Sequence, residues 1–175
     1  MRMTILAVTA LCLLAGGAVA SAQPGATGPV RVAVSIQPMK YFAERVGGAR
    51  VQVMALVAPG QDPHTYEATP RQVHAAATAQ AYFKIRWPFE EGLLAKLQGM
   101  NPRLKVFDVT TRITFRTLAE DEECAHEGHE HAHAHGKGEP DPHIWLSPRL
   151  AAVIAEGIAD GLREIDPDGI AEYDR

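Results

Sequence analysis

Cysteine is scarce in this sequence of 175 residues, which contains only Cys12 and Cys124. Cys12 lies inside an apolar N-terminal run, and cleavage of that run would leave Cys124 as a lone thiol without a partner for an internal disulfide. Cys-x-x-Cys pairs, which commonly form redox centres or bind zinc, are absent as well. The cysteines therefore carry no information about the compartment in which the protein works.

Other signatures of function are also missing. The sequence has no Gly-x-Ser-x-Gly turn around a nucleophilic serine and no glycine-rich loop that would hold a phosphate. The net charge is -4 without a strongly basic stretch, which argues against a nucleic acid as partner. The pair Glu90-Glu91 is interpreted as a helix start that favours the helix dipole, and not as an acid and base pair for catalysis.

The first 22 residues have the layout of a secretory signal peptide. A positive charge at Arg2 precedes an apolar run over residues 5–14, and small residues at 18–22 offer a cleavage site. The run is shorter than the ~20 apolar residues that a membrane-spanning helix needs, which disfavours the alternative of a membrane anchor. Cys12 lacks the small residues that precede a lipidated cysteine, which disfavours a lipoprotein. We therefore predict an exported, soluble protein with a flexible leader over residues 23–29.

Strands and helices alternate along residues 30–165. Alternating apolar residues and apolar runs predict strands, and apolar spacings of three and four residues predict helices. The predicted strands cover residues 30–36, 51–57, 81–85 and 104–109, and the predicted helices cover residues 38–46, 70–79, 89–99 and 148–165. This alternation favours the α/β class, with one four-stranded, mostly parallel sheet flanked by helices.

Local patterns add detail to this fold. The almost continuous apolar run over residues 51–57 indicates a strand that is buried on both faces. Thr69 and Gln72 are spaced as a capping box, and Ser147 is placed to cap the helix that starts at Pro148.

The tripeptide Asp-Pro-His occurs twice, at residues 62–64 and 141–143. Proline stiffens each loop and restricts the preceding aspartate to an extended conformation, so each imidazole is held in a defined orientation. The first copy follows the second predicted strand and the second copy follows the fourth, and in such sheets ligands bind at the carboxyl ends of strands. We therefore predict that His64 and His143 belong to one divalent-metal site.

Neighbouring residues complete this hypothesis. Two histidines are fewer than the four ligands that zinc typically takes, and a loop histidine is by itself more often a polar surface residue, so both interpretations stay open at this point. Carboxylates that orient the imidazoles are expected to come from Asp62, Asp141 or Glu67. Trp145 and Leu146 are expected to bury the second loop.

A histidine-rich, acidic tract occupies residues 121–139, and it holds five of the eight histidines: His126, His129, His131, His133 and His135. Short tracts of this kind bind transition metals without a packed core. Each bound ion must order a flexible chain, so we expect weak binding of several ions as an auxiliary site. The alternative is a solvated loop of low complexity.

These motifs, taken in order, resemble the periplasmic solute-binding proteins of zinc and manganese ABC transporters, the ZnuA/TroA-like family. The resemblance is carried by residues 34–38, 59–70, 89–90 and 141–148, together with the histidine-rich tract before the second Asp-Pro-His. That family has two α/β lobes joined by one long helix, with the metal between them. The resemblance implies that residues 30–165 form the N-terminal lobe, that residues 166–175 begin the interlobe helix, and that the second lobe is absent from this sequence.

The resemblance also implies a function. His64 and His143 match the two ligands of the N-terminal lobe, in a periplasmic protein that captures Zn(II) and delivers it to a membrane permease. Mn(II) is the alternative cargo, although the histidine-rich tract favours the softer metal. A stand-alone zinc buffer or chaperone that uses the tract is a second hypothesis. A metal-dependent hydrolase is the third, and it would need an open coordination position and a base such as Glu67.

Overall fold

A computed structural model describes residues 28–117 and 140–175 of the chain. The predicted signal peptide over residues 1–22, most of the leader and the histidine-rich tract over residues 121–139 lie outside the described residues. His126, His129, His131, His133 and His135 therefore stay at the level of the sequence prediction. None of the helices in the described ranges combines the length and the apolar character that a membrane span requires.

The described residues form one four-stranded sheet in which every pair of neighbouring strands is parallel. The strands are β1 (Val30–Val34), β2 (Val51–Ala55), β3 (Ala81–Lys84) and β4 (Lys105–Asp108), and their order is β2-β1-β3-β4. This result confirms the predicted α/β class and the parallel sheet. Because all strands run the same way, the loops that follow them meet at one edge of the sheet.

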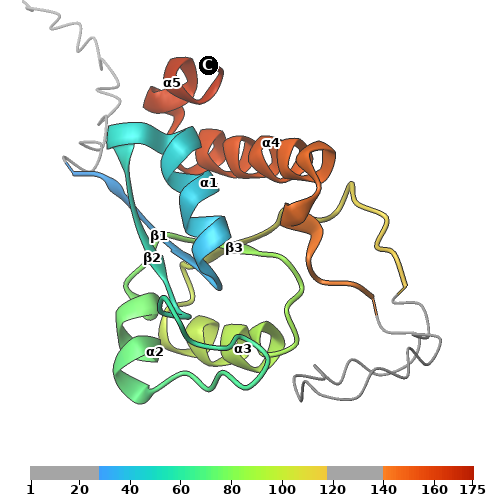
Figure 1. The fold of residues 1–175 in the computed structure, drawn as a ribbon. Helices are drawn as coiled ribbons and strands as arrows, with labels where there is room; N and C mark the ends of the chain where they lie inside the picture. Colours follow the sequence, from blue (N-terminus) through green and yellow to red (C-terminus); the bar gives the residue numbers. More distant parts are fainter. Residues whose placement is uncertain (1–27, 118–139) are drawn as a thin grey trace, which may run out of the picture.

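Helices cover both faces of the sheet (Figure 1). One face is covered by α1 (Gln37–Gly47) and α4 (Pro148–Ile165), and the opposite face is covered by α2 (Pro70–Ala77) and α3 (Glu90–Met100). A short helix, α5 (Ile170–Tyr173), follows α4 after a 3-10 turn at Pro167–Gly169. The assignment of residues 166–175 to an interlobe helix stays a prediction.

The two predicted helix caps have different outcomes. At α2 the Thr69 side chain accepts a hydrogen bond from the backbone N–H of Gln72, and the Gln72 side chain accepts from the backbone N–H of Thr69, which confirms the capping box. At α4 Ser147 occupies the cap position, but its hydroxyl makes no capping bond, so that part of the prediction is wrong. Pro148 starts α4 with its fixed φ, as Pro70 does at α2.

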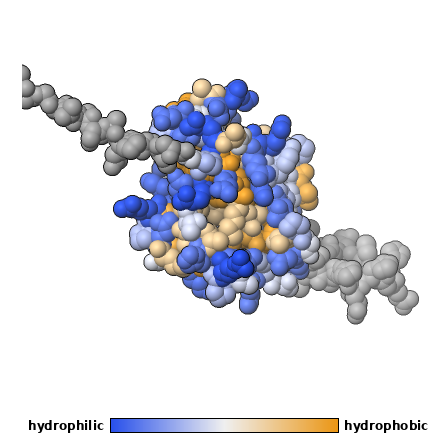
Figure 2. Space-filling model, turned by 90° about the vertical axis from the view of Figure 1, so that its left-hand side faces the viewer, coloured by the Kyte–Doolittle hydropathy of each residue, from blue (hydrophilic) through white to orange (hydrophobic). Residues whose placement is uncertain are grey.

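The prediction that the run over residues 51–57 is a strand buried on both faces is also wrong. β2 is an edge strand, and within it only Val53 is buried. Leu56 and Val57 are buried beyond the end of the strand, where their N–H groups donate to the carbonyls of Val34 and Ser35 at 3.0 and 2.9 Å. Figure 2, which shows the side on which β2 lies, has apolar residues in its centre with hydrophilic residues around them. The run therefore combines a half-covered edge strand with buried loop residues.

Candidate metal site

His64 lies in the long loop between β2 and α2, at the edge of the sheet where the strands end. The Asp62 carboxylate accepts a hydrogen bond from the backbone N–H of His64 at 2.9 Å, which closes a tight turn around Pro63. The His64 side chain is exposed on this edge. Asp62 thus shapes the backbone that carries the imidazole.

His143 is held more directly by its aspartate. Asp141 Oδ1 accepts a hydrogen bond from the backbone N–H of His143 at 2.9 Å and lies 2.8 Å from Nδ1 of the same residue. A carboxylate bonded to one ring nitrogen sets the tautomer and the orientation of the ring, and it makes Nε2 the nitrogen that would ligate a metal. The geometry therefore suits the orienting role predicted for Asp141.

The two Asp-Pro-His loops bring their imidazoles together. The ring centres of His64 and His143 are 5.8 Å apart, with an angle of 44° between the ring planes. Two imidazoles on one tetrahedral zinc, with Zn–N of ~2.0–2.1 Å, would have ring centres about 5 Å apart. The observed separation is close to that value.

An indole that was not predicted as part of the site lies between the loops. Trp87 follows β3, is only 2% exposed, and donates from Nε1 to the carbonyl of Pro63 at 3.0 Å. Its ring centre lies 5.2 Å from that of His64 and 5.8 Å from that of His143. Trp145 packs against both Trp87 and His143, with ring centres 5.6 and 5.4 Å apart. An aromatic residue directly after a buried strand, on the ligand-binding edge, is the sequence signal that points to it.

α3 begins at Glu90, which confirms the predicted helix start, but the burial of this residue was not predicted. It is 1% exposed, and its carboxylate accepts hydrogen bonds from the backbone N–H groups of Trp87 at 2.8 Å and Ile85 at 3.1 Å and from the Tyr82 hydroxyl at 3.2 Å. Burial raises the pKa of Glu90 to about 7, while these donors act in the opposite direction. The residue is therefore an interior carboxylate at the start of α3. The apolar and aromatic residues before it, over residues 87–89, are the signal for such a position.

The other residues around the second loop also differ from expectation. Leu146 is 73% exposed and Trp145 is half-buried, so the prediction that both bury the loop is wrong for Leu146. Residues 144–146 form a 3-10 turn that directs its side chains to different sides, and Ile144, 5% exposed, is the one that enters the core.

Glu67 is exposed, whereas Tyr66 beside it is buried against Phe89, with ring centres 5.0 Å apart. Within residues 28–117 and 140–175, no group of three or more histidine, cysteine, aspartate or glutamate side chains is arranged to hold a metal ion. The described residues therefore bring a pair of imidazoles together, and the orienting role of Glu67 stays a prediction.

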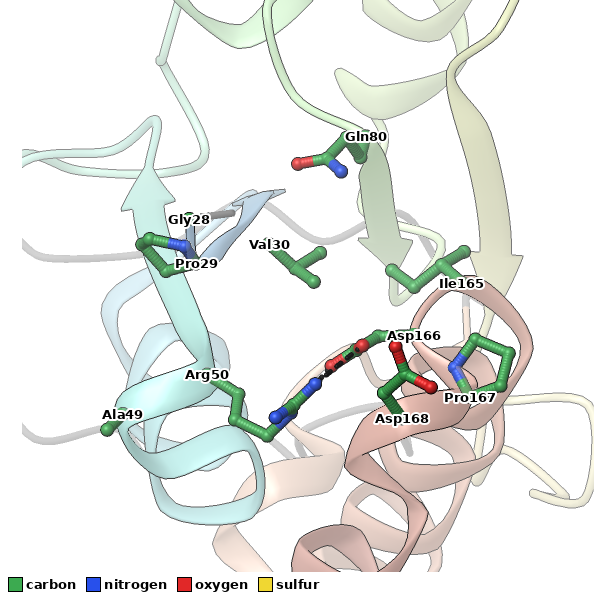
Figure 3. Close-up of a pocket in the computed structure, with 10 residues that line it drawn as sticks. All are labelled: Gly28, Pro29, Val30, Ala49, Arg50, Gln80, Ile165, Asp166, Pro167 and Asp168. Atoms are coloured by element: carbon green, nitrogen blue, oxygen red, sulfur yellow. Dashed lines mark hydrogen bonds and ion pairs between the residues drawn. The ribbon is translucent and has the colours of Figure 1, made fainter. Parts of the chain in front are cut away.

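A cavity of about 580 Å³ lies at the opposite end of the strands, where they begin. Arg50 lines this cavity and makes a two-pronged ion pair with Asp166, from Nε at 2.7 Å and from Nη2 at 2.8 Å (Figure 3). The Tyr173 hydroxyl also donates to Asp166. Arg50 and Asp166 are thus engaged with each other, and they join the start of β2 to the end of α4.

The sequence matches the family model described as zinc-uptake complex component A periplasmic, ZnuA, over residues 32–175. The zinc-binding lipoprotein AdcA of Streptococcus pneumoniae is 29% identical over 153 residues, which are 85% of this chain and 29% of AdcA. The manganese-binding lipoprotein MntA of Halalkalibacterium halodurans is 26% identical over 144 residues, which are 82% of this chain and 42% of MntA.

A solved structure agrees with the fold. The crystal structure of a zinc-bound deletion mutant of ZnuA aligns with a TM-score of 0.69 and 37% identity, covering 83% of this chain and 50% of that chain. This chain therefore spans half or less of the length of these three relatives. With the family match extending over most of its length, the chain belongs to the ZnuA family of zinc-uptake periplasmic components.

Proposed function

We propose that this chain is the metal-capturing N-terminal lobe of a periplasmic solute-binding protein that takes up Zn(II) and delivers it to the permease of an ABC transporter. The observation that carries the proposal is the approach of His64 and His143 to a ring separation of 5.8 Å on stiff loops at the ligand-binding edge. The ion is the cargo of the protein, so its site must bind and also release it. An open edge of the sheet suits such a role better than an enclosed cage.

Zinc is the cargo that the donor set favours. Imidazole nitrogens suit zinc, whereas manganese is better served by carboxylates, carbonyls and water. AdcA is named for zinc and MntA for manganese, so the family contains both kinds of protein. The pair of imidazoles supports zinc as the cargo of this chain, and Mn(II) is the alternative.

A binding role is supported over an enzymatic one by the relatives, which are named as metal-binding lipoproteins. A hydrolytic zinc site keeps three protein ligands and needs a base beside the metal-bound water. The described residues contain no such cluster, and Glu67 is not part of one. The remaining coordination positions are filled, in this proposal, by water or by groups outside the described residues.

The proposal is tested by calorimetric titration with zinc of residues 23–175 and of the same chain without residues 121–139. Removing the tract removes five histidines that would bind zinc weakly and obscure a single site. We expect the shortened chain to bind one zinc ion, and we expect the double substitution His64→Ala, His143→Ala to abolish that binding.

His74→Ala is the matched control, because His74 is an exposed histidine on α2, away from the Asp-Pro-His loops. This variant should bind zinc as the parent does. An unchanged titration curve in the double variant would contradict the proposal. Loss of all binding on removal of the tract would favour the buffer hypothesis instead. A competition titration in which Mn(II) displaces zinc at equal concentration would assign the site to manganese.

A further inference from the structure

Glu90 is connected to both histidines through a short series of contacts. Its carboxylate binds the N–H groups of Ile85 and Trp87, which are the residues on either side of Arg86. Arg86 has a φ of 62°, in the left-handed region that residues other than glycine rarely adopt. Two N–H groups that converge on one buried carboxylate hold the backbone in this conformation. The turn between β3 and α3 is therefore organised around Glu90.

This turn directs the Trp87 side chain into the space between the two Asp-Pro-His loops. The indole N–H is bonded to the Pro63 carbonyl, which ties Trp87 to the first loop next to His64. The indole ring meets the His143 ring edge to face, with an interplanar angle of 90°. Trp87 thus contacts both loops at once, and it is buried, so its position is determined by packing and not by solvent.

We infer that Glu90 and Trp87 are positioning residues that set the separation of His64 and His143. Glu90 holds the turn between β3 and α3, and this turn positions the indole of Trp87. The indole then holds the first loop through its hydrogen bond to Pro63 and holds both imidazoles through ring contacts. The consequence for metal affinity rests on the proposed function, whereas the placement of the two rings does not. Neither residue touches the ion in this scheme.

The role requires an acceptor at position 90 more than it requires a charge. In Glu90→Gln the amide oxygen can accept from the N–H groups of Ile85 and Trp87, while the amide nitrogen donates to the Tyr82 oxygen. In Glu90→Leu both N–H groups lose their acceptor inside the core. Glutamine should therefore preserve the turn and leucine should release it.

The experiment combines proton–carbon NMR spectra of the histidine rings with zinc titration, on residues 23–175 without residues 121–139, as in the titration proposed above. The nearby indole shifts the ring signals of His64 and His143 away from those of solvent-exposed histidines, and His64→Ala and His143→Ala assign these signals. We expect Glu90→Leu and Trp87→Phe to move both signals and to weaken zinc binding by about 10–100-fold. Glu90→Gln should keep both the signals and the affinity. Glu91→Gln is the matched control, because Glu91 is the exposed neighbour on the same helix.

The outcomes separate the inference from the proposed function. Unmoved His64 and His143 signals in Trp87→Phe would overturn the inference, as would signals in Glu90→Gln that move as far as those in Glu90→Leu. Circular dichroism establishes that each variant is folded, and if Glu90→Leu is not, Trp87→Phe and Glu90→Gln decide the matter alone. If zinc binding survives the double histidine substitution, the proposed function fails while the metal-free spectra still test the placement of the rings.

Discussion

The two aspartates of the repeated tripeptide make different hydrogen bonds, although each is followed by the same Pro-His pair. Asp62 binds the backbone N–H of His64, whereas Asp141 binds both the backbone N–H and the Nδ1 atom of His143. A ring nitrogen held by a carboxylate fixes the ring more firmly than a backbone turn does. Asp141→Asn should therefore weaken zinc binding more than Asp62→Asn, and parallel calorimetric titrations of the two variants check this order. Equal losses of zinc affinity in the two variants would show that both aspartates act by shaping the backbone.

The raised pKa of Glu90 predicts a pH dependence of stability that can be measured without metal. Its pKa is raised to about 7 in the folded protein from an ordinary value of 4.5, so the folded state holds a proton that the unfolded state has released between these pH values. The free energy of unfolding should therefore fall as the pH rises from 4.5 to 7, by about 3 kcal/mol from this residue. Glu90→Gln cannot ionise and should lack this loss.

Urea denaturation of the parent and Glu90→Gln at several pH values measures the effect. The two proteins should converge below pH 4.5 and differ most above pH 7, with the variant the more stable. Glu91→Gln, at the exposed neighbouring position, should follow the parent throughout. A constant difference between parent and Glu90→Gln at all pH values would show that the Glu90 carboxyl does not titrate in this range.

At the level of elements, a glycine allows α4 to pack closely against the sheet. A Cβ atom at Gly161 would lie 2.5 Å from Cε1 of Phe83 and 3.0 Å from Cγ of Phe107. Phe83 is fully buried, so its ring has no free space into which to move. The close approach of α4 places Ile158 and Leu162 in the core. The helix also leads the chain back from the second Asp-Pro-His loop.

Gly161→Ala should therefore destabilise the protein by about 1–3 kcal/mol through overpacking, in spite of the better helix propensity of alanine. The same substitution at Gly92, in α3, is the matched control, because a Cβ there meets nothing within 4 Å. Gly92→Ala should stabilise the protein by about 0.5–1 kcal/mol. Thermal and urea denaturation of both variants measure the opposite signs, and a neutral Gly161→Ala would mean that α4 can move away from the sheet at little cost.

At the level of the whole molecule, the Arg50–Asp166 pair joins residues that are far apart in the sequence. It connects the 3-10 turn before β2 with the end of α4, and Tyr173 adds a bond from α5. The hydrogen bond from Arg50 holds the pKa of Asp166 below its ordinary value of 3.8. Burial and the bond to Asp166 raise the pKa of Tyr173 to about 12, so its hydroxyl remains a donor at neutral pH.

Because the pKa of Asp166 is lowered, the stability that this pair contributes is present above pH 3.8 and is lost as the pH falls through the folded-state pKa. Asp166→Asn should lower the melting temperature at pH 7, and the difference from the parent should shrink in strong acid. Asp168→Asn, at an exposed position two residues further on, should change stability by no more than about 0.5 kcal/mol. Equal melting temperatures for Asp166→Asn and the parent at pH 7 would contradict this role.

The features that could be predicted from the sequence alone are local. The alternation of strands and helices, the capping box at Thr69 and the two stiff Asp-Pro-His loops depend on residues only a few positions apart, so their patterns can be interpreted without knowing the fold. Tertiary structure decided the rest. The position of β2 at the edge, the burial of Glu90 and the packing of Trp87 against both histidines depend on which strands are neighbours and which helix covers them. The close approach of two imidazoles 79 residues apart likewise arises only when parallel strands carry both loops to one edge of the sheet.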